Sequence, residues 1–172
     1  MTDLRDTDRL FFDQTGLDQG QVERTVAEAL NGAEDGELYL EYTQSEGITF
    51  DDGRIKSASF NTDQGFGLRS VSGEATGYAH ASELSQEALK RAAATVRAVR
   101  SGKGGTMAAP PQGTNQRLYA DVNPLGGMSF EAKVKLLAEI DAYARSKDPR
   151  VRQVTASLGG SSSDTGGPQP AA

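Results

Sequence analysis

The chain has 172 residues and a formal net charge of −6, from 24 acidic and 18 basic side chains. This length is sufficient for one domain with a hydrophobic core, and the acidic balance disfavours a phosphate-neutralising surface, so we expect no nucleic-acid partner. No apolar run approaches the ~18 residues of a membrane-spanning helix and the N-terminus lacks an apolar signal segment, so we expect a cytoplasmic protein with no membrane partner.

The first predicted elements are a helix and a strand. Asp18 suits the N-cap of a helix and Gly32 suits its end, so a helix is expected over residues 18–31. Residues 37–45 then alternate apolar and polar side chains, as a half-buried strand does. Residues 1–16 are expected to form an N-terminal extension. The apolar stripe of the helix comprises Val22, Val26, Ala29 and Leu30.

A hairpin follows this strand. Asp52-Gly53 between two β-prone runs is the strongest hairpin signal in the chain. A two-residue turn there would set Phe50 opposite Ile55. Between residues 42 and 48 we expect a longer loop or a bulge, because a turn at residues 46–47 would mismatch the apolar faces.

The glycine-rich stretch "DQGFGLRSVSGEATGYAHA" covers residues 63–81. A dinucleotide-binding fingerprint would need a glycine three residues after Gly67, where the chain has Ser70. No Gly-Lys-Ser/Thr follows either, which disfavours a Walker loop. A second hairpin with a turn at Ser72-Gly73 explains the stretch better, and it predicts that a Tyr78 ring covers the bare backbone of Gly67.

This predicted hairpin sets large residues opposite small ones, which leaves room for a helix to pack closely. One face pairs Phe66 with Ala79, Leu68 with Gly77, and Ser70 with Ala75. The other face pairs Gly67 with Tyr78 and Gly65 with His80. The glycines are therefore interpreted as devices of sheet geometry.

Two further helices are predicted. One runs from Ser82 or Ser85 to Arg100, with Gly102 as its stop. A long loop over residues 101–128 separates it from a helix that begins after Ser129 and ends at Pro149. The expected apolar stripes are Leu84, Ala88, Ala92, Val96 and Val99 in the first helix, and Phe130, Val134, Leu137, Ile140 and Ala144 in the second.

The C-terminal part is expected to comprise a last strand over residues 151–158 and a disordered Gly/Ser/Pro tail over residues 159–172. The abrupt change of composition at this point favours truncation or a frameshift. The fold class expected from these elements is α+β, with an antiparallel sheet of about five to six strands and three helices packed mainly on one face.

The only histidine, His80, is a candidate general base or metal ligand. It has no visible nucleophile or companion ligand, so we interpret it as a half-exposed polar residue of a strand end. The absence of cysteine excludes thiolate chemistry and removes the other common ligand of transition metals. Ser161–Ser163 lie in the expected tail with no base in reach.

The acidic candidates are also better explained structurally. Glu37 and Glu41 share a strand face, but Tyr39 lies between them and the alternation points them to solvent. Asp51 and Asp52 lack the further oxygen ligands of a calcium loop, so turn chemistry explains them. We therefore assign no catalytic, cofactor-binding or metal-binding residue.

Several motifs resemble a known family. The segments are "FNTDQGFGLRS", "SGEATGYAHA", "LYADVNPLGGMSFEAKVKLLAEIDAYAR" and "RVRQVTASL". In this order, and over roughly residues 17–158, they resemble the N-terminal domain of TldD-like proteins of the TldD/PmbA metallopeptidase family. Residues 17–158 are therefore expected to form this domain.

The resemblance implies a zinc-dependent peptidase that works with a second, related subunit in a TldD–TldE-like complex and takes extended peptides. In that family an HExxxH helix of the C-terminal domain holds the zinc. This chain contains no HExxxH, so no catalytic residue of the family has a position here. We expect a non-catalytic N-terminal domain, truncated before the catalytic domain and inactive alone, with no cofactor in this chain.

Two alternatives stay open. The chain could be a stand-alone binding or regulatory module that pairs with a full-length TldD/TldE-like subunit, or a degenerate fragment without activity. The expected partners are a TldE/PmbA-like subunit or a second copy of the chain, and an extended peptide substrate in the full enzyme. An exposed sheet edge could pair with the backbone of that peptide, which needs no particular side chains.

Overall fold

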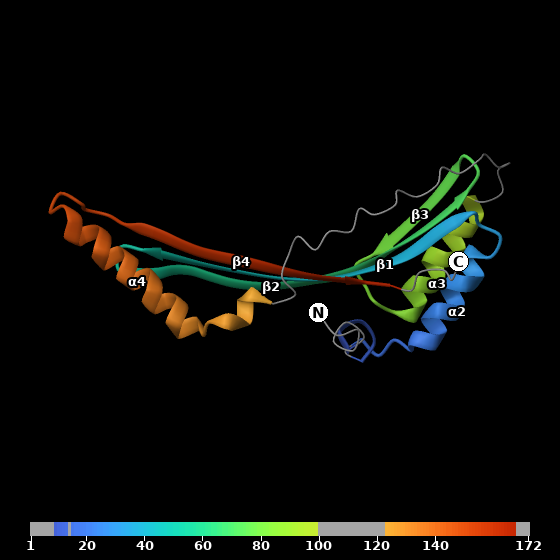
Figure 1. The fold of residues 1–172 in the computed structure, drawn as a ribbon, viewed down its shortest axis with the longest axis horizontal. Coiled ribbons are helices and arrows are strands. Elements are labelled where there is room, and N and C mark those ends of the chain that lie inside the picture. Colours follow the sequence, from blue (N-terminus) through green and yellow to red (C-terminus); the bar gives the residue numbers. More distant parts are fainter. Residues whose placement is uncertain (1–8, 14, 100–122, 168–172) are drawn as a thin grey trace, which may run out of the picture. The chain divides into compact units, whose positions relative to one another are not determined.

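The computed structural model describes residues 9–13, 15–99 and 123–167. Its four strands form one sheet in the order β3-β2-β1-β4 (Figure 1). The fold is α+β, as predicted, but with four strands and not the expected five to six. In chain order the elements are η1 (Arg9–Asp13), α2 (Gln19–Leu30), β1 (Asp35–Asp51), β2 (Arg54–Ser72), β3 (Ala75–Ala81), α3 (Gln86–Val99), η2 (Pro124–Gly127), α4 (Phe130–Lys147) and β4 (Thr155–Gly166).

The strands β1 and β2 are longer than predicted, which accounts for the lower strand number. The loop or bulge expected between residues 42 and 48 is wrong, because β1 continues through this region. Leu38 and Leu40 before it, and Ile48 and Phe50 after it, are all buried. These residues are all even-numbered, so one uninterrupted alternation keeps them on the same face and no turn is needed.

Both predicted hairpins form, the second with a shifted turn. Asp52 and Gly53 have φ values of 51° and 81°, as a type I′ turn requires. In the second hairpin Ser72 pairs with Ala75, so the turn lies at Gly73–Glu74 and not at Ser72–Gly73. Gly73 has φ of 60°, and placing it first in the turn puts the glycine where a positive φ is needed.

Because of this shift, each β2 residue pairs with a β3 residue two positions later than predicted, and the side chains stay on their predicted faces of the sheet. Phe66 pairs with Ala81, Leu68 with Ala79, and Ser70 with Gly77; Gly67 pairs with His80. The expected close helix contact is present. A Cβ added to Gly77 would lie 3.0 Å from the Cα and the carbonyl oxygen of Val96 on α3.

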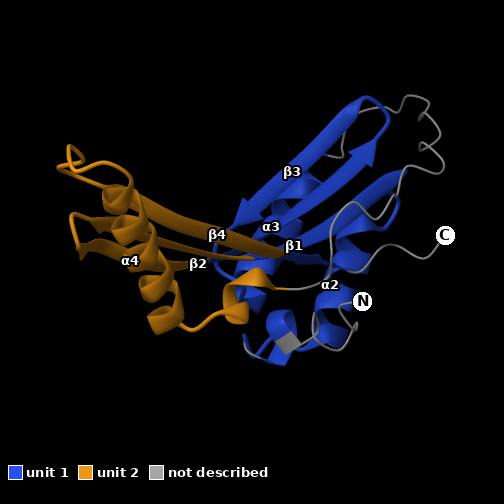
Figure 2. Cartoon of the chain, turned by 60° about the vertical axis from the view of Figure 1, so that its left-hand side comes forward, with its two compact units in different colours: residues 1–42, 63–121, 164–172 blue, residues 43–62, 122–163 orange. Residues whose placement is uncertain are grey.

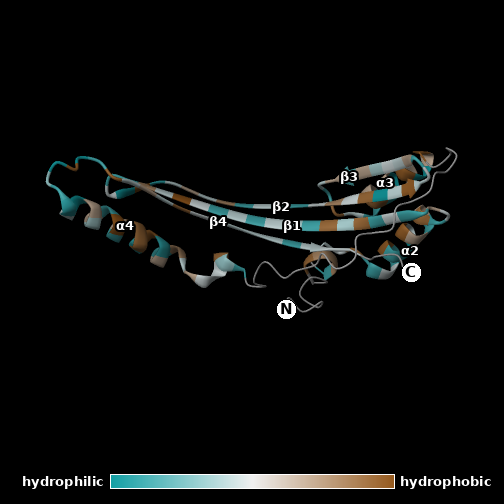
Figure 3. Cartoon of the chain, turned by 45° about the horizontal axis from the view of Figure 1, so that its top comes forward, coloured by the Kyte–Doolittle hydropathy of each residue, from teal (hydrophilic) through white to brown (hydrophobic). Residues whose placement is uncertain are grey.

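Unit 1 comprises residues 1–42, 63–121 and 164–172 (Figure 2). The helix α2 is capped by Asp18, which accepts from the Gln21 N–H at 2.7 Å, and Ser85 caps α3 through Ala88 N–H at 3.2 Å. Figure 3 shows hydrophobic residues on both helices and alternating along β1. The core residues of unit 1 are Phe11, Val22, Val26, Ala29, Leu38, Leu40, Phe66, Leu68, Leu84, Ala88, Leu89, Ala92, Ala93 and Val96.

Two details of unit 1 differ from the sequence prediction. Phe11 is buried in this core although residues 1–16 were expected to form an extension. Val99 of the predicted stripe is exposed, whereas Leu89 and Ala93 are buried. Residues 100–122, which include most of the predicted loop and Gly102, lie outside the described residues.

Unit 2 comprises residues 43–62 and 122–163. Ser129 caps α4, as predicted, by accepting from the Ala132 N–H at 3.2 Å. The predicted stripe of this helix is partly wrong, since Phe130 and Ile140 are exposed. The core consists of Ile48, Phe50 and Leu137, against which Val134, Ala138, Ala156 and Leu158 pack.

The last strand is also longer than predicted. It begins at Thr155 and continues to Gly166, so the expectation of disorder is wrong over residues 159–166. Strand pairing uses backbone groups, which glycine and serine also provide. None of the helices in the described ranges has the length and apolarity needed to span a bilayer.

Candidate functional site

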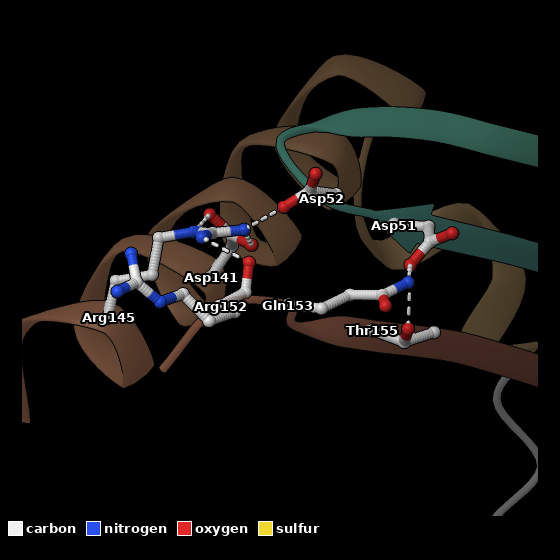
Figure 4. A network of polar contacts seen from close by, with 7 residues as sticks. All are labelled: Asp51, Asp52, Asp141, Arg145, Arg152, Gln153 and Thr155. Carbon is white, nitrogen blue, oxygen red and sulfur yellow. Dashed lines mark hydrogen bonds and ion pairs between the residues drawn. The ribbon is translucent and has the colours of Figure 1, made fainter. Parts of the chain in front are cut away.

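A network of polar contacts surrounds the β1–β2 turn in unit 2 (Figure 4). Its centre is Arg145 of α4, whose Nε donates to Asp141 Oδ2 at 2.9 Å. The same guanidinium donates to Asp52 in the turn through Nη2 and to the Arg152 carbonyl through Nη1 at 3.3 Å. The bonds to Asp141 and Asp52, that to Asp141 most strongly, raise the pKa of Arg145. Arg145 therefore ties the turn to α4 and to the segment before β4.

Asp51 forms the second half of this network. Its Oδ1 accepts from Thr155 Oγ1 at 2.7 Å and from Gln153 Nε2 at 3.0 Å, and its Oδ2 accepts from Lys56 Nζ at 3.3 Å. These hydrogen bonds, the Thr155 bond above all, lower the pKa of Asp51 to about 2. At neutral pH Asp51 is an ionised acceptor, which cannot serve as a general acid.

We call these two halves together the hairpin clasp; its side chains belong to Asp51, Asp52, Asp141, Arg145, Gln153 and Thr155. Its carboxylates are occupied by guanidinium, amide and hydroxyl donors, and its one hydroxyl, that of Thr155, is bonded to Asp51, whose lowered pKa makes it a weak base. The arrangement therefore fastens the hairpin tip to α4 and β4, and offers no chemistry of its own.

A second polar contact crosses the core of unit 2. Lys133 of α4 is buried, and its Nζ donates to Glu46 Oε1 at 2.5 Å and to the Leu125 carbonyl at 2.8 Å. Sequence reasoning missed this pair. A signal was available, because Glu46 falls on the same alternation of β1 as the buried Ile48 and Phe50, and an inward carboxylate requires a buried cation.

The carboxylates of β1 in unit 1 also have a structural role. Glu37 accepts from Arg69 Nε at 2.9 Å, and Asp35 accepts from Arg69 Nη2 at 2.7 Å. These bonds, the Asp35 bond first, raise the pKa of Arg69. Glu37 and Glu41 are both exposed, in agreement with the predicted solvated face.

His80 lies exposed on β3, opposite Gly67. Its ring centroid is 5.8 Å from that of Tyr78. A Cβ added to Gly67 would lie 2.7 Å from Tyr78 Oη, so the tyrosine ring does cover this glycine. Tyr78 pairs with Arg69, so its ring reaches Gly67 diagonally across the two strands, and the residue directly opposite Gly67 is His80.

Ser161–Ser163 belong to β4, and Ser163 Oγ lies 3.0 Å from Thr43 Oγ1. These serines are therefore strand residues with sheet contacts. That no residue of the chain is catalytic, cofactor-binding or metal-binding stays a prediction.

The metal donors that the structure describes do not fit a zinc centre. Within the described ranges no three histidine, cysteine, aspartate or glutamate residues are grouped so that they could hold a metal ion. Asp52 and Asp141 are both bonded to Arg145, and Asp35 and Glu37 are both bonded to Arg69. The fold and this site together define a sheet domain of the α+β class whose polar network is structural.

Sequence comparison assigns this domain to a family. Residues 36–100 match PmbA/TldA metallopeptidase domain 1. The Metalloprotease TldD homolog of Haemophilus influenzae is 38% identical over 125 residues, which cover 71% of this chain and 26% of that protein. The Metalloprotease TldD homolog of Buchnera aphidicola subsp. Acyrthosiphon pisum is 35% identical over 127 residues, which cover 73% of this chain and 26% of that protein. The chain thus spans about a quarter of the length of these relatives.

Solved structures share the fold. A protein from Bacteroides thetaiotaomicron aligns with a TM-score of 0.62 at 14% identity, covering 86% of this chain and 38% of its own. TldE from Thermococcus kodakarensis aligns with a TM-score of 0.62 at 15% identity, covering 86% and 34%. The chain carries the N-terminal domain of the TldD/PmbA family.

Proposed function

We propose that this chain is the non-catalytic N-terminal domain of a TldD-like zinc metallopeptidase. The catalytic domain, with its zinc, is supplied by polypeptide outside the 172 residues. The proposal rests on the contrast between the name of the relatives and the metal-binding side chains that this chain offers. The relatives are called metalloproteases, whereas this chain has one histidine, no cysteine and no HExxxH.

These metal-binding side chains are too few to build the zinc site of a peptidase. A catalytic zinc is held by several protein ligands, usually histidines and a carboxylate, and it keeps an open position for water. The single histidine, His80, is exposed next to Tyr78, and the carboxylates of the hairpin clasp are occupied by other donors. On this proposal the chain by itself supplies neither a zinc site nor the catalytic base of a peptidase.

The contribution of this domain to the enzyme is a peptide-binding sheet edge. The strand β4 is the last in the sheet order, and its residues from Thr155 to Ser163 are uncharged and mostly small. An extended peptide can add to such an edge through main-chain hydrogen bonds, whatever its sequence. In the complete enzyme this edge would hold the substrate extended beside the catalytic domain.

The test is a zinc and activity measurement on the purified 172-residue chain. We expect no stoichiometric zinc and no cleavage of an unfolded peptide, and we expect cleavage when the remaining segment of a TldD relative is added. The His80→Ala variant is the matched control and should behave identically. Stoichiometric zinc together with cleavage by the chain alone would refute the proposal.

A second candidate is a stand-alone module that pairs with a full-length TldD/TldE-like subunit. It is favoured by the alignment with TldE, which covers 86% of this chain but only 34% of that structure. Such a module would occupy the place of one subunit's N-terminal domain. Co-purification with a full-length relative, without any gain in cleavage, would favour this candidate over the first.

A further inference from the structure

The face of the sheet opposite α2 and α3 carries a cluster of aromatic side chains in unit 1. The two helices pack on the face that holds Leu38 and Leu68 (Figure 1). Alternate residues of a strand point to opposite faces, and on the other face Tyr39, Tyr78 and His80 are exposed. We call these three side chains the aromatic platform.

Two rings of the aromatic platform lie on β3, beside the bare backbone of Gly67. His80 pairs with Gly67, and a Cβ added to this glycine would lie 2.7 Å from Tyr78 Oη and 3.2 Å from Tyr78 Cε2. The ring centroids of Tyr78 and His80 are 5.8 Å apart, and their planes differ by 31°. The glycine therefore lets the tyrosine ring lie low over the sheet, next to the imidazole.

The third ring, that of Tyr39, reaches the same place from β1. Glu37 of β1 accepts from Arg69 Nε of β2 at 2.9 Å, so these two residues face each other across the strands. The strands of a hairpin are antiparallel, so two residues further along β1 corresponds to two residues back along β2. Tyr39 is thus level with Gly67, and the three rings border one glycine.

Carboxylates border the aromatic platform. Glu37 and Glu41 lie on the same face of β1 as Tyr39, one on each side of it along the strand, and both are exposed. The pKa of Tyr39 is raised, first by burial, then by Glu41 and then by Tyr78, in keeping with the closeness of these groups. Exposed carboxylates beside aromatic faces attract cations.

The guanidinium of Arg69 lies on this face but is held by carboxylates. Arg69 is directly opposite Tyr78. Asp35 accepts from its Nη2 at 2.7 Å, and Glu37 accepts from its Nε at 2.9 Å. These bonds draw the guanidinium towards β1, and Tyr39 and Tyr78 keep exposed fractions of 44% and 61%. The rings are thus accessible to a cation from outside.

We propose that the aromatic platform binds the guanidinium of an arginine side chain in a polypeptide. A guanidinium is planar and weakly hydrated, stacks on aromatic faces and bonds to carboxylates, so it matches both the rings and their acidic border. A free amino acid fits less well, because the acidic face repels its α-carboxylate, which is an amide within a polypeptide. This inference goes beyond the proposed function and does not depend on it.

The first test is an NMR titration of the isotope-labelled full chain with the peptide acetyl-Gly-Arg-Gly-amide. Amide shifts should centre on Tyr39, Gly67 and Tyr78, with a dissociation constant in the millimolar range, because exposed cation–aromatic contacts are weak. The matched peptide carries citrulline, which has the shape of arginine without its charge, and should bind about fivefold more weakly. Added salt should weaken the binding of the arginine peptide.

The second test uses variants of the chain. Tyr39→Leu keeps an apolar side chain without the aromatic face and should weaken binding about threefold. Tyr143→Leu is the matched control, because Tyr143 is an exposed tyrosine of α4 whose ring already carries Lys147 Nζ at 4.0 Å, and it should leave binding unchanged. Arg69→Gln removes the competing cation of the face and should tighten binding about threefold, whereas Arg69→Lys keeps the charge and should not.

The outcomes that would overturn the proposal are distinct from those that concern the proposed function. Equal affinity for the arginine and citrulline peptides, unchanged affinity in Tyr39→Leu, or unchanged or weaker binding in Arg69→Gln would each overturn it. Amide shifts confined to β4 would also overturn it, and would support the peptide-binding sheet edge instead. Zinc binding and cleavage by the chain alone would refute the proposed function and leave this site standing.

Discussion

The two units of this chain are held together by different physical means. Among the residues that the structure describes, unit 1 has a core of fourteen buried apolar residues, contributed mainly by α2, α3 and the sheet. Unit 2 has three, Ile48, Phe50 and Leu137, and adds the Lys133–Glu46 pair and the hairpin clasp. Unit 1 therefore depends on packing, while unit 2 depends to a larger extent on the correct placement of charges.

The difference follows from what each helix presents to the sheet. The helix α3 buries Ala88, Leu89, Ala92, Ala93 and Val96, an entirely apolar face. The helix α4 buries Lys133, Leu137 and Asp141, so two of its three buried side chains are ionisable. Burying a charge is costly unless it is paired. Unit 2 is thus specified by its ion pairs as well as by apolar burial.

The largest effect is expected in unit 1, from Leu68→Ala. Leu68 is fully buried, so its truncation removes transfer free energy and leaves a cavity, at a cost of about 4 kcal/mol in unfolding free energy. Urea denaturation measures this cost. The control Ile140→Ala, at an exposed position of α4, should cost less than about 1 kcal/mol. Equal losses in the two variants would contradict the assignment of unit 1 as the apolar core.

A slightly smaller effect is expected in unit 2, from Lys133→Met. This change keeps the side-chain length but leaves Glu46 without its cation, and should cost about 3 kcal/mol because breaking a buried pair is more harmful than replacing it. The double variant Lys133→Met/Glu46→Leu should recover most of the loss. Urea denaturation of both single variants and the double variant gives the coupling. Additive losses would show that the pair does not contribute to stability.

The parts of the fold that were predictable from the sequence depend on local chemistry. Asp18 and Ser129 cap their helices through bonds to residues three positions ahead, and the Asp52-Gly53 turn needs only its own two positive φ values. The parts that were missed depend on distant segments. Lys133 and Glu46 are 87 residues apart, and residues 159–166 form a strand only because the backbone of the sheet is available to them.

The candidate site could likewise be predicted from the sequence only where it depends on local chemistry. The sequence correctly indicated turn chemistry at Asp52, which any Asp-Gly between β-prone runs would favour. The bonds from Thr155 and Gln153 to Asp51 join residues more than 100 positions apart, and no local pattern contains them. The hairpin clasp could therefore be identified only from the three-dimensional structure.

The smallest effect is expected from the hairpin clasp on acidification. The pKa of Asp51 is lowered from 3.8 to about 2, so its contribution to stability is present above pH about 4 and is lost as the pH falls towards about 2. Asp51→Asn cannot titrate, and its urea midpoint should fall less steeply than that of the wild type in this window. The control Glu74→Gln, an exposed turn residue of unit 1, should keep the wild-type slope. If Asp51→Asn also kept that slope, the hydrogen bonds of Thr155 and Gln153 would not hold the hairpin tip in solution, and the charge-dependent character of unit 2 would rest on Lys133 and Arg145 alone.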